Sequence, residues 1–406
     1  MKTIFDRRYV ILAQLFMVRT IPTMFFMMAL PVILRLEGYP LKVIAFLQLA
    51  GVPYLLKFLW APLLDRGGAA ENHYKQWILW TGLGCGMLLL GLGLLDLTRH
   101  FRLVVALVLV ISIVTSTLDI AISALYIKLL SFEKRGTGSS TKVLGLNLGS
   151  ILGSGFFLLV YNHFGWQACI SGIGSIILFS LSALPWLEEK HQEYKGSDAF
   201  RWSAIFSFFR TRGRGRWFVL IVLNSLSPSA AFFMMKPFLV DRGVATDTIA
   251  FLVGFYGMSV AALMALATGS HRFQTYLLRR RRAYIDSIGL SAVAVGLFVP
   301  ITLSMDTTPL LYLAVALLNA AITLASVVSA TLVMDFSRKD LASVDYALQM
   351  TGIHLGGLGM AALSGLIVAA VGYPEFFFAL AFFAVLMILV SIGMFRGDWI
   401  SAGSPG

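Results

Sequence analysis

The stretch Tyr54 to Arg66 reads YLLKFLWAPLLDR. It places one lysine, Lys57, inside an apolar run and closes that run with a carboxylate and an arginine, Asp65 and Arg66. A run this apolar is typical of a helix surrounded by lipid or by other helices, and a charged end is typical of the point where such a helix meets water. The stretch therefore indicates a membrane span and raises the question of what its lysine contacts.

The whole chain has the composition of a membrane protein. Of its 406 residues, 58% are hydrophobic and 13% are charged, and the mean hydropathy is +0.83. This leaves too little polar surface to cover a water-soluble globule. Apolar segments of about 20 residues recur along the chain, and that length crosses about 30 Å of hydrocarbon as an α-helix. We therefore expect an all-α integral membrane protein in a lipid bilayer.

Charge clusters, glycines and prolines divide the chain into twelve apolar spans. The first resembles a signal peptide, but it is too long for one and contains Arg19, so we interpret it as an uncleaved helix. The two cysteines, Cys85 and Cys169, fall in different spans and predict neither a disulfide framework nor a metal site. The expected spans are 9–35, 42–62, 75–96, 103–127, 142–162, 167–187, 217–240, 248–268, 284–303, 310–334, 344–371 and 375–395.

One long polar connection lies between the sixth and seventh spans. Within it, Trp202, Ile205, Phe206 and Phe209 follow helical i, i+3, i+4, i+7 spacing, which predicts a short amphipathic helix in the membrane interface. The expected organisation is an N-terminal six-helix bundle over residues 1–187, a cytoplasmic linker over 188–216 and a C-terminal six-helix bundle over 217–406.

Basic residues indicate the orientation. If the N-terminus is cytoplasmic, 24 lysines and arginines fall on that side, Lys142 and the run Arg279 to Arg282 among them, and 5 fall on the other side. This asymmetry predicts that both termini are cytoplasmic. A four-arginine loop beside a helix end is an ordinary membrane anchor, so we expect no nucleic-acid partner.

The two halves of the chain repeat each other. The sequence FFMM at Phe25 to Met28 recurs at Phe232 to Met235, and GLNLG at Gly145 to Gly149 is matched by GIHLG at Gly352 to Gly356. Both matches have the same offset of 207 residues, and each pairs a span with the span six places later. A repeat in the same direction suits two bundles related by an axis along the membrane normal, which is the layout of major facilitator transporters.

Four stretches carry a more specific resemblance. LKFLWAPLLDR at the exit of the second span resembles the AmpG-type branch of the major facilitator superfamily, which includes muropeptide permeases, acetyl-CoA transporters and RhtX/FptX-type siderophore transporters. The other three are ALPVILR (Ala29 to Arg35), RGTGSSTKVLGLNLG (Arg135 to Gly149) and SVDYALQ (Ser343 to Gln349). ALPVILR and SVDYALQ are most similar to the siderophore group. The chain departs from the branch at Ser123, where a second acidic residue is common, and at GGAAEN after Arg66.

The resemblance implies a gating role for Asp65 and Arg66. They match the loop between the second and third helices, where the family carboxylate is expected to bind basic groups or a helix N-terminus across the bundle interface in one conformation. An ordinary polar helix end is the alternative. Lys57 lies about two turns deeper, and either snorkelling to the headgroups or a place in the transport pathway would explain it.

Buried charges are the next candidates. Arg19 and Asp119 lie at similar depths in the first and fourth spans, and a charge near mid-bilayer costs at least about 2.5 to 3.5 kcal/mol. We therefore expect them to pair or to share the central cavity, with a structural ion pair as the alternative. Asp119 is also a candidate for coupling. Lys236, near the outer end of the seventh span, could meet an anionic substrate or could snorkel.

His354 lies mid-span between two glycines, where a titratable imidazole could take part in proton coupling, or could be a satisfied polar group. Four aromatic residues could line the cavity beside a bulky substrate or could be packing residues: Phe25, Phe26, Phe232 and Phe233. Small residues one turn apart allow close helix approach, and we assign this packing role to Gly145, Gly149, Gly153, Gly352 and Gly356.

Missing motifs narrow the function. The sequence has no GxxxxGK[ST] phosphate loop and no HExxH or cysteine–histidine cluster, so we expect no cofactor and no catalytic metal. We expect a monomeric secondary transporter of the bacterial inner membrane rather than an enzyme. We expect it to import a small-molecule substrate that is a large anionic solute, with proton coupling. The resemblance favours a ferric siderophore. A muropeptide is the first alternative and a membrane-embedded enzyme a remote one.

Overall fold

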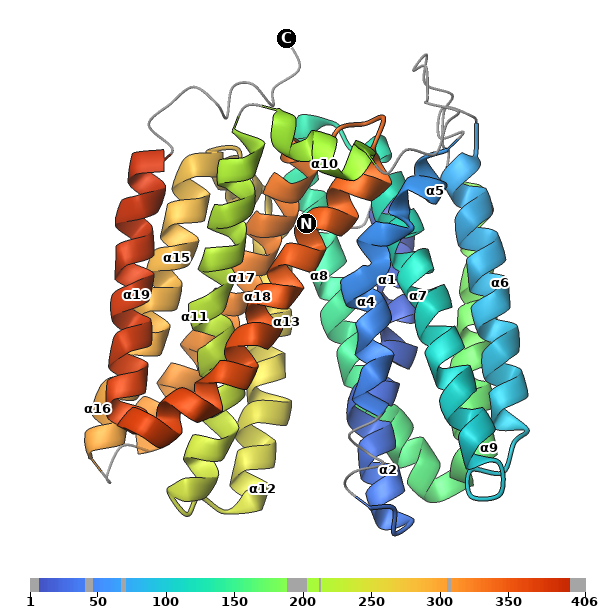
Figure 1. Ribbon diagram of the computed structural model, residues 1–406, viewed down its shortest axis with the longest axis horizontal. Coiled ribbons are helices and arrows are strands. Elements are labelled where there is room, and N and C mark those ends of the chain that lie inside the picture. Colours follow the sequence, from blue (N-terminus) through green and yellow to red (C-terminus); the bar gives the residue numbers. More distant parts are fainter. Residues whose placement is uncertain are drawn as a thin grey trace.

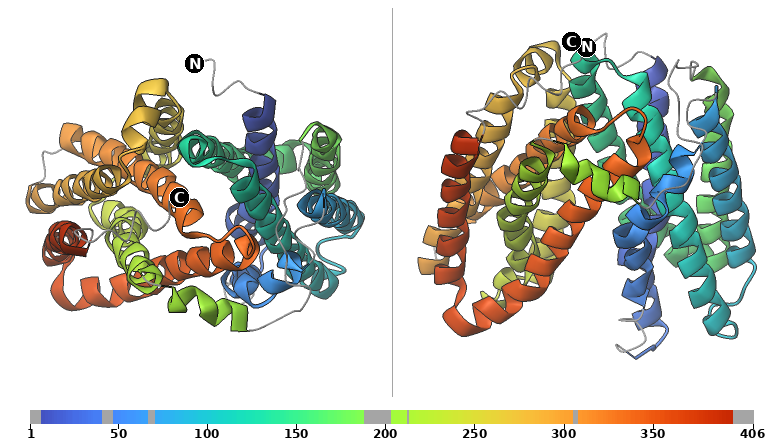
Figure 2. Two further views of the ribbon diagram at one scale, coloured as in Figure 1. Left: turned by 90° about the horizontal axis from the view of Figure 1, so that it is seen from above. Right: turned by 45° about the horizontal axis from the view of Figure 1, so that its top comes forward.

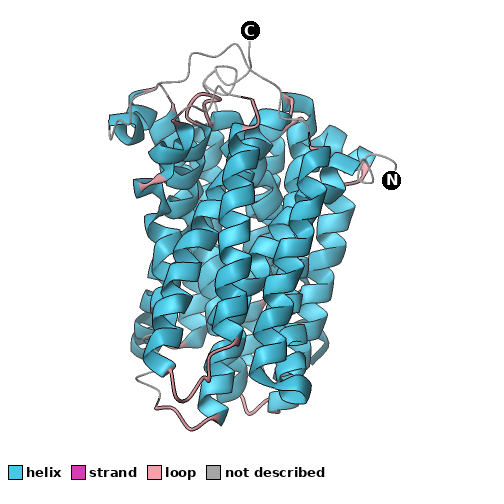
Figure 3. Cartoon of the chain, turned by 90° about the vertical axis from the view of Figure 1, so that its right-hand side faces the viewer, coloured by secondary structure: helices cyan, strands magenta, loops and turns pink. Residues whose placement is uncertain are grey.

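The computed structural model describes residues 7–40, 47–66, 71–187, 203–211, 213–304 and 308–394. Within these ranges the chain forms helices and connecting turns, and no strand is present (Figure 1, Figure 3). The helices run between two ends of a single bundle. We name the end crossed by α10 (Ser203–Arg210) the α10 end, and the end that holds α12 (Thr246–Ile249) the α12 end.

The first half of the chain contains long helices and one irregular span. The span that carries Lys57 is divided into short helices, and Pro53 and Pro62 lie in the first turn of two of them, where the missing N–H of proline costs no helical hydrogen bond. Lys57 begins the 3₁₀ turn between them. The elements are α1 (Arg7–Met24), η1 (Phe25–Ala29), α2 (Leu30–Leu36), η2 (Gln48–Gly51), α4 (Val52–Leu56), η3 (Lys57–Leu59), α5 (Ala61–Asp65), α6 (His73–Gly93), α7 (Phe101–Leu129), η4 (Phe132–Lys134), α8 (Arg135–Ile151), η5 (Leu152–Phe156), α9 (Phe157–Ser180) and η6 (Leu181–Trp186).

The second half begins after α10. Its elements are α11 (Arg214–Asp241), η7 (Ala250–Tyr256), α13 (Gly257–Thr268), α14 (His271–Leu277), α15 (Arg280–Gly296), α16 (Phe298–Leu303), α17 (Thr308–Phe336), α18 (Ala342–Val371) and α19 (Tyr373–Met394), together with α12. Figure 2, left, shows these helices grouped on one side of the molecule and those of the first half on the other.

Ten helical segments of the described residues are long and apolar enough to cross a membrane. One of them runs from Phe132 to Trp186, 55 residues, and it reverses direction at Gly165, whose φ of 77° lies in the left-handed region. A shorter apolar helix covers Leu49–Leu59. The all-helical membrane class expected from composition is therefore confirmed, whereas a count of twelve crossings stays a prediction.

The helix limits differ from the expectation in one place that matters. The fifth span was expected to start at residue 142, with Lys142 in a cytoplasmic loop. Instead α8 begins at Arg135, so Lys142 lies about two turns inside a helix and its side chain is buried. The expectation for Lys142 was wrong because glycine, serine and threonine in RGTGSSTK look polar, yet they are small enough to be buried against neighbouring helices.

The linker helix divides its apolar residues between two environments. Ile205 and Phe208 of α10 are buried, while Phe206 and Phe209 are 67% and 43% exposed. Trp202 and the rest of residues 188–202 lie outside the described ranges. The pattern thus predicted a helix in this region correctly: α10 packs through one stripe onto α11 and α18, and its position in a membrane interface stays a prediction.

The two halves share a core at the α10 end and have separate cores at the α12 end. One apolar cluster contains residues of both halves, such as Phe16 and Tyr126 with Trp217 and Tyr284. A second cluster contains residues of the first half alone, and a third contains residues of the second half alone. The halves are therefore closed against each other at the α10 end.

Glycines allow the closest helix contact in the first half. A Cβ atom added at Gly145, Gly149 or Gly153 would collide with a backbone carbonyl oxygen of α1, on Ala13, Met17 and Ile21 respectively. In the second half, Gly352 and Gly356 of α18 accommodate side chains of α11 instead, among them Phe218 and Ser225. The repeated glycines thus serve contacts of different kinds in the two halves.

Candidate functional site

Four charged side chains meet at the centre of the bundle. Asp119 of α7 lies between two cations: its Oδ1 is 3.1 Å from Arg19 Nε of α1, and its Oδ2 accepts a hydrogen bond of 2.6 Å from Lys57 Nζ. The Arg19 contact is an ion pair without hydrogen-bond alignment. Lys142 of α8 lies close enough to interact electrostatically with all three of these groups.

Lys57 answers the question raised by its sequence. Its side chain is fully buried and ends on Asp119, so the snorkelling interpretation is wrong. The 3₁₀ turn of η3 brings this residue onto the face of the broken span that points to α7. Arg19 and Asp119, which were expected to pair or to share a cavity, are brought together as an ion pair.

The cluster has more positive than negative charge. Three cations contact or approach one carboxylate, and no other carboxylate of the described residues forms an ion pair with Arg19, Lys57 or Lys142. Lys142 donates a hydrogen bond of 2.8 Å to the hydroxyl of Tyr346 on α18, and its ammonium group lies 4.4 Å from the centre of that ring. A buried excess of two positive charges favours the binding of an anion.

A cavity of about 370 Å³ lies beside this cluster, between α8 of the first half and α11, α17 and α18 of the second. Lys142 is the one member of the charged cluster that lines it. His354 lines it too, as do several small hydroxyl and amide side chains and a set of apolar ones. The lining residues outside α8 include Asn224, Ser225, Pro228, Ser229, Phe232, Phe233, Ile322, Ser326, Ser329, Met350 and Ile353.

The structure separates the aromatic candidates. Phe232 and Phe233 line the cavity. Phe25 and Phe26 are instead buried in the core of the first half, where Phe25 packs near Trp166, so they do not line it. Lys236 is exposed on α11 and does not line it either. The cavity role expected for Phe25 and Phe26 is therefore corrected, because η1 buries both rings in the core of the first half.

A polar network closes the α10 end. Asp65, buried at the end of α5, accepts hydrogen bonds from Tyr74 and from the backbone amides of Ser343 (2.9 Å) and Val344 (3.0 Å) at the first turn of α18. Burial raises the pKa of Asp65 to about 6, although these hydrogen bonds oppose the rise. Arg66 is exposed beside it.

A second closing contact was missed by sequence reasoning. Asp335 at the end of α17 binds Arg135 of the first half and Arg280 of its own half, each at 2.7 Å. Arg280 also donates to the backbone oxygen of Phe132 at 2.9 Å. Arg280 belongs to the four-arginine run, which was interpreted as an ordinary anchor, and nothing in the sequence around Asp335 indicates its partners.

Lys142 and Tyr346 were also missed as site residues. Lys142 precedes Gly145 and Gly149 by three and seven positions, so all three share one face of α8. Because those glycines pack against α1, the spacing could have placed Lys142 against α1 as well. In the structure its ammonium group lies 5.2 Å from the centre of the Phe16 ring of α1.

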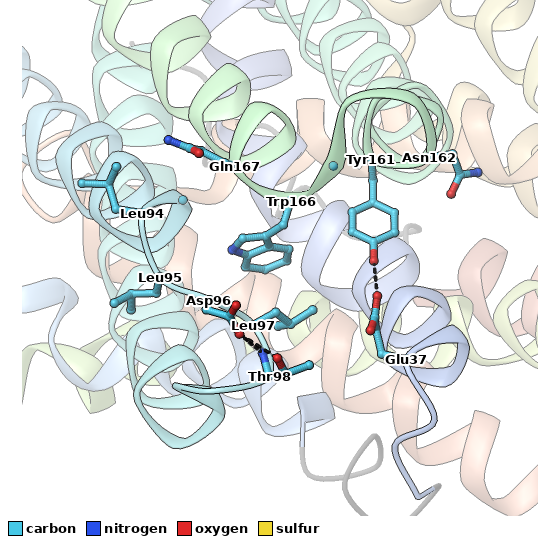
Figure 4. A pocket seen from close by; sticks show the side chains of 12 residues that line it. Glu37, Leu94, Leu95, Asp96, Leu97, Thr98, Tyr161, Asn162, Trp166 and Gln167 are labelled. Carbon is cyan, nitrogen blue, oxygen red and sulfur yellow. Dashed lines mark hydrogen bonds between the residues drawn. The ribbon is translucent and has the colours of Figure 1, made fainter.

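A larger pocket of about 710 Å³ lies at the α12 end of the first half, around Trp166 (Figure 4). Its two carboxylates already accept hydrogen bonds. Tyr161 donates to Glu37 at 2.7 Å, and Asp96 accepts from the backbone and hydroxyl of Thr98. These hydrogen bonds from Thr98 lower the pKa of Asp96. The charged residues that line this pocket are two carboxylates, Glu37 and Asp96, which do not favour an anion, so it is not our candidate for an anion site.

Comparisons with known proteins agree with this architecture. The family model of the Major Facilitator Superfamily matches residues 15–359. The anhydromuropeptide permease of Escherichia coli K12 is 28% identical over 219 residues, which cover 53% of this chain and 44% of the permease. The protein of Rickettsia felis named "Putative transporter AmpG 4" is 20% identical over 381 residues, 88% of this chain and 89% of that protein.

Two solved structures share the fold. The human organic anion transporter MFSD10 (TETRAN) has a TM-score of 0.72 at 15% identity, covering 95% of this chain and 99% of its own. A bacterial homologue of the iron transporter ferroportin, in an outward-facing state with soaked iron, has a TM-score of 0.71 at 12% identity, covering 97% and 100%. The family model spans most of the chain, and AmpG-type permeases are among its relatives: the chain belongs to the Major Facilitator Superfamily.

Proposed function

We propose that this chain is a secondary active transporter of the bacterial inner membrane that imports an organic anion by alternating access. The observation that carries the proposal is the buried excess of positive charge at Arg19, Lys57 and Lys142 beside a cavity between the two halves. Asp119 pairs with Arg19 and Lys57, but one carboxylate does not balance three basic groups, and a negatively charged solute would supply the missing negative charge.

The proposed topology has twelve crossings with both termini in the cytoplasm. It adds to the ten long spans the short apolar helix Leu49–Leu59 and the division of the 55-residue segment at Gly165. Residues 1–187 and 217–406 would be the two moving bundles, with 188–216 as their linker. The basic-residue count would then put the α10 end in the cytoplasm.

In that orientation the molecule is closed toward the cytoplasm. Among the described residues, the hydrogen bonds that join the halves, such as those of Asp65, Lys142 and Arg135, lie between the α10 end and the middle of the bundle. We therefore propose an outward-facing state in which Asp65, with Arg66 beside it, acts in the cytoplasmic gate. Import would require these contacts to break.

We assign different roles to the two residues proposed for coupling. Asp119 is held by two cations, so its role in this state is to neutralise them. His354 lines the cavity and has no such restraint among the described contacts, so it is the proposed proton carrier.

Two solutes are candidates. The anhydromuropeptide permease and the AmpG-named relatives favour an anhydromuropeptide. The stretches ALPVILR and SVDYALQ favour a ferric siderophore instead. We place the muropeptide first, because its support comes from matches over long parts of the chain, whereas the siderophore rests on two short stretches.

The test is uptake by purified protein in lipid vesicles with an imposed inward proton gradient, using labelled anhydromuropeptide and labelled ferric siderophores in parallel. Gradient-dependent uptake of one of them identifies the solute. Lys236→Gln, a change on an exposed face, should transport normally, whereas Arg19→Ala should not. Uptake of neither compound, by protein that is folded in the vesicles, would contradict import of these two anion classes.

A further inference from the structure

We propose that Lys142 is the residue that binds the anionic group of the solute, a carboxylate or similar oxyanion, and that the opposite wall of the cavity takes an apolar part of the same molecule. This inference rests on the proposed function, since it names the group that the transport site recognises. The excess of positive charge alone does not identify Lys142, because any of the three basic residues could have bound the anionic group.

Charge pairing singles out Lys142. Arg19 and Lys57 each contact Asp119, and both of its oxygens are occupied by them. Lys142 reaches no carboxylate among the described residues, and its one hydrogen bond goes to the neutral hydroxyl of Tyr346. An ammonium group has three donors. Lys142 therefore retains both an uncompensated charge and unused donors for an incoming oxyanion.

The position of Lys142 in the cavity also distinguishes it from the other two basic residues. Lys142 lines the cavity, whereas Arg19 and Lys57 do not. Around it lie neutral hydrogen-bonding groups, Asn224 and Ser225 of α11 and His354 of α18, which could hold the rest of a carboxylate or an adjoining polar group. Small-molecule sites are usually apolar pockets that contain a few polar groups at fixed positions.

The rest of the wall is apolar and belongs to the second half. Phe232, Phe233, Pro228, Met350 and Ile353 line it, without any acidic side chain among the cavity residues. A solute with one anionic end and one apolar or aromatic end matches this distribution of charge, whereas a uniformly charged anion would lose hydration at the phenylalanines without compensation.

Lys142 also touches both halves. It belongs to α8, while Tyr346 belongs to α18, and the two form a hydrogen bond and a cation–π contact across the interface. An anion that neutralises Lys142 weakens its attraction for the Tyr346 ring. Solute binding at this residue would therefore reduce one of the contacts that hold the halves together.

The experiment measures charge selectivity in the cavity and needs no transported solute. Ser326 lines the cavity with an exposed side chain, so Ser326→Cys provides a reactive thiol there. The native Cys85 and Cys169 are fully buried, and the parent protein supplies their background rate. The thiol is labelled with two methanethiosulfonates of similar size, one carrying a sulfonate and the other a trimethylammonium group.

We expect the sulfonate reagent to react faster in the presence of Lys142, and the ratio of the two rates to fall by about tenfold in Lys142→Gln. Lys142→Arg should retain the preference. Two matched controls should also retain it: Lys236→Gln, which removes an exposed cation from α11, and Tyr346→Phe, which removes the hydroxyl but leaves the lysine. An unchanged ratio in folded Lys142→Gln would overturn the proposal.

A second measurement covers the case in which Lys142→Gln does not fold. With Lys142 in place, benzenesulfonate should protect the Ser326→Cys thiol from the uncharged reagent methyl methanethiosulfonate. Benzenesulfonamide, which has nearly the same shape without the charge, should protect it at least about tenfold less well. Equal protection by both compounds would contradict an anion site.

Failure of this inference differs from failure of the proposed function. If the protein takes up an anion but the labelling ratio does not depend on Lys142, the transport function is supported and Lys142 is not its anion site. Lys142-dependent selectivity without uptake of either candidate solute would keep the site and reject those solutes.

Discussion

The Asp65 carboxylate accepts a hydrogen bond of 2.9 Å from the backbone amide of Ser343, although the two residues are 278 positions apart. Asp65 belongs to the first half of the molecule, and Ser343 lies in the first turn of α18 in the second half. The first amides of a helix have no partner within it and carry partial positive charge, so a carboxylate is well suited to bind them. This contact is the basis of the first prediction.

We predict that acid stabilises the closed α10 end through Asp65. Burial raises its pKa to about 6 in the closed state, and we take an ordinary pKa near 4 for the open, hydrated state. Between these values the closed state binds a proton that the open state does not. The closed population should therefore rise as the pH falls from about 6 to about 4. The free energy of opening should increase by up to about 3 kcal/mol over this range and should not change with pH above about 7.

Spin labels report this equilibrium. Glu133 and Arg281 are exposed near the α10 end on opposite halves, so cysteines at these positions give an inter-half distance. Asp65→Asn, which is neutral at every pH, should abolish the response between pH 4.5 and 7.5. A response of equal size in Asp65→Asn would assign the pH dependence to another group.

The Asp335 contacts predict a second way to open the same end. Arg135→Gln removes the partner from the first half, while Arg280 still pairs with Asp335 inside the second half. The fold should persist and the open population should increase, because the lost contact links the halves and is worth about 1 to 3 kcal/mol. Arg282→Gln, at an exposed pair, is the control and should leave the spin-label distances unchanged.

The central ion cluster predicts a specific pattern of stability. Asp119→Asn leaves the cations Arg19 and Lys57 without their carboxylate and should reduce the free energy of unfolding by about 3 to 5 kcal/mol. The double variant Asp119→Asn/Lys57→Met removes one of these cations and should recover part of the loss. Thermal unfolding in detergent measures both. A double variant that is less stable than the single one would argue against charge imbalance as the cause.

The glycine contacts of α8 predict a position-dependent effect of a single methyl group. Gly149→Ala places a Cβ against the carbonyl oxygen of Met17 and should cost about 1 to 3 kcal/mol, because the backbones must separate. Gly155→Ala, about two turns further on, meets no atom within 4 Å and should be tolerated. The yields and melting temperatures of the two purified variants test this difference. Equal values would show that α1 can move away from α8 without loss of stability.

The proposed role of His354 predicts a change in coupling rather than in folding. His354→Gln keeps a polar side chain of similar length in the cavity but cannot carry a proton. Uptake driven by a proton gradient should fall at least about tenfold, while exchange of solute across vesicles without a gradient should continue. Loss of both activities would indicate a role in solute binding, and retention of both would exclude proton transfer by this residue.

The sequence was most informative about the fold. Hydropathy, the 207-residue repeat and the exit sequence LKFLWAPLLDR predicted a helical membrane protein of the family to which the chain belongs. Helix limits were less predictable. The span around Lys57 is broken by prolines, and α8 starts seven residues early, because hydropathy does not distinguish small polar residues in a loop from the same residues buried between helices.

The candidate site was only partly predictable, because charge identifies buried residues but not their partners. Arg19 and Asp119 stood out as isolated charges within apolar spans, and the structure places them in contact. Lys142 and Asp335 lie close to the ends of their spans, where charged residues are ordinary. Their partners, Tyr346 and Arg135, come from the other half of the chain, a relationship that no local pattern contains.

The division of the cavity between a cationic wall and an aromatic wall has a consequence for chemical delivery. If Lys142 holds the anionic end of the solute, then the end that lies against Phe232 and Phe233 is the one to which a dye or an antibiotic can be attached without loss of recognition. Esterification of the anionic end would remove the recognised charge instead. The molecule thus prescribes which end of a natural cargo is available for conjugation.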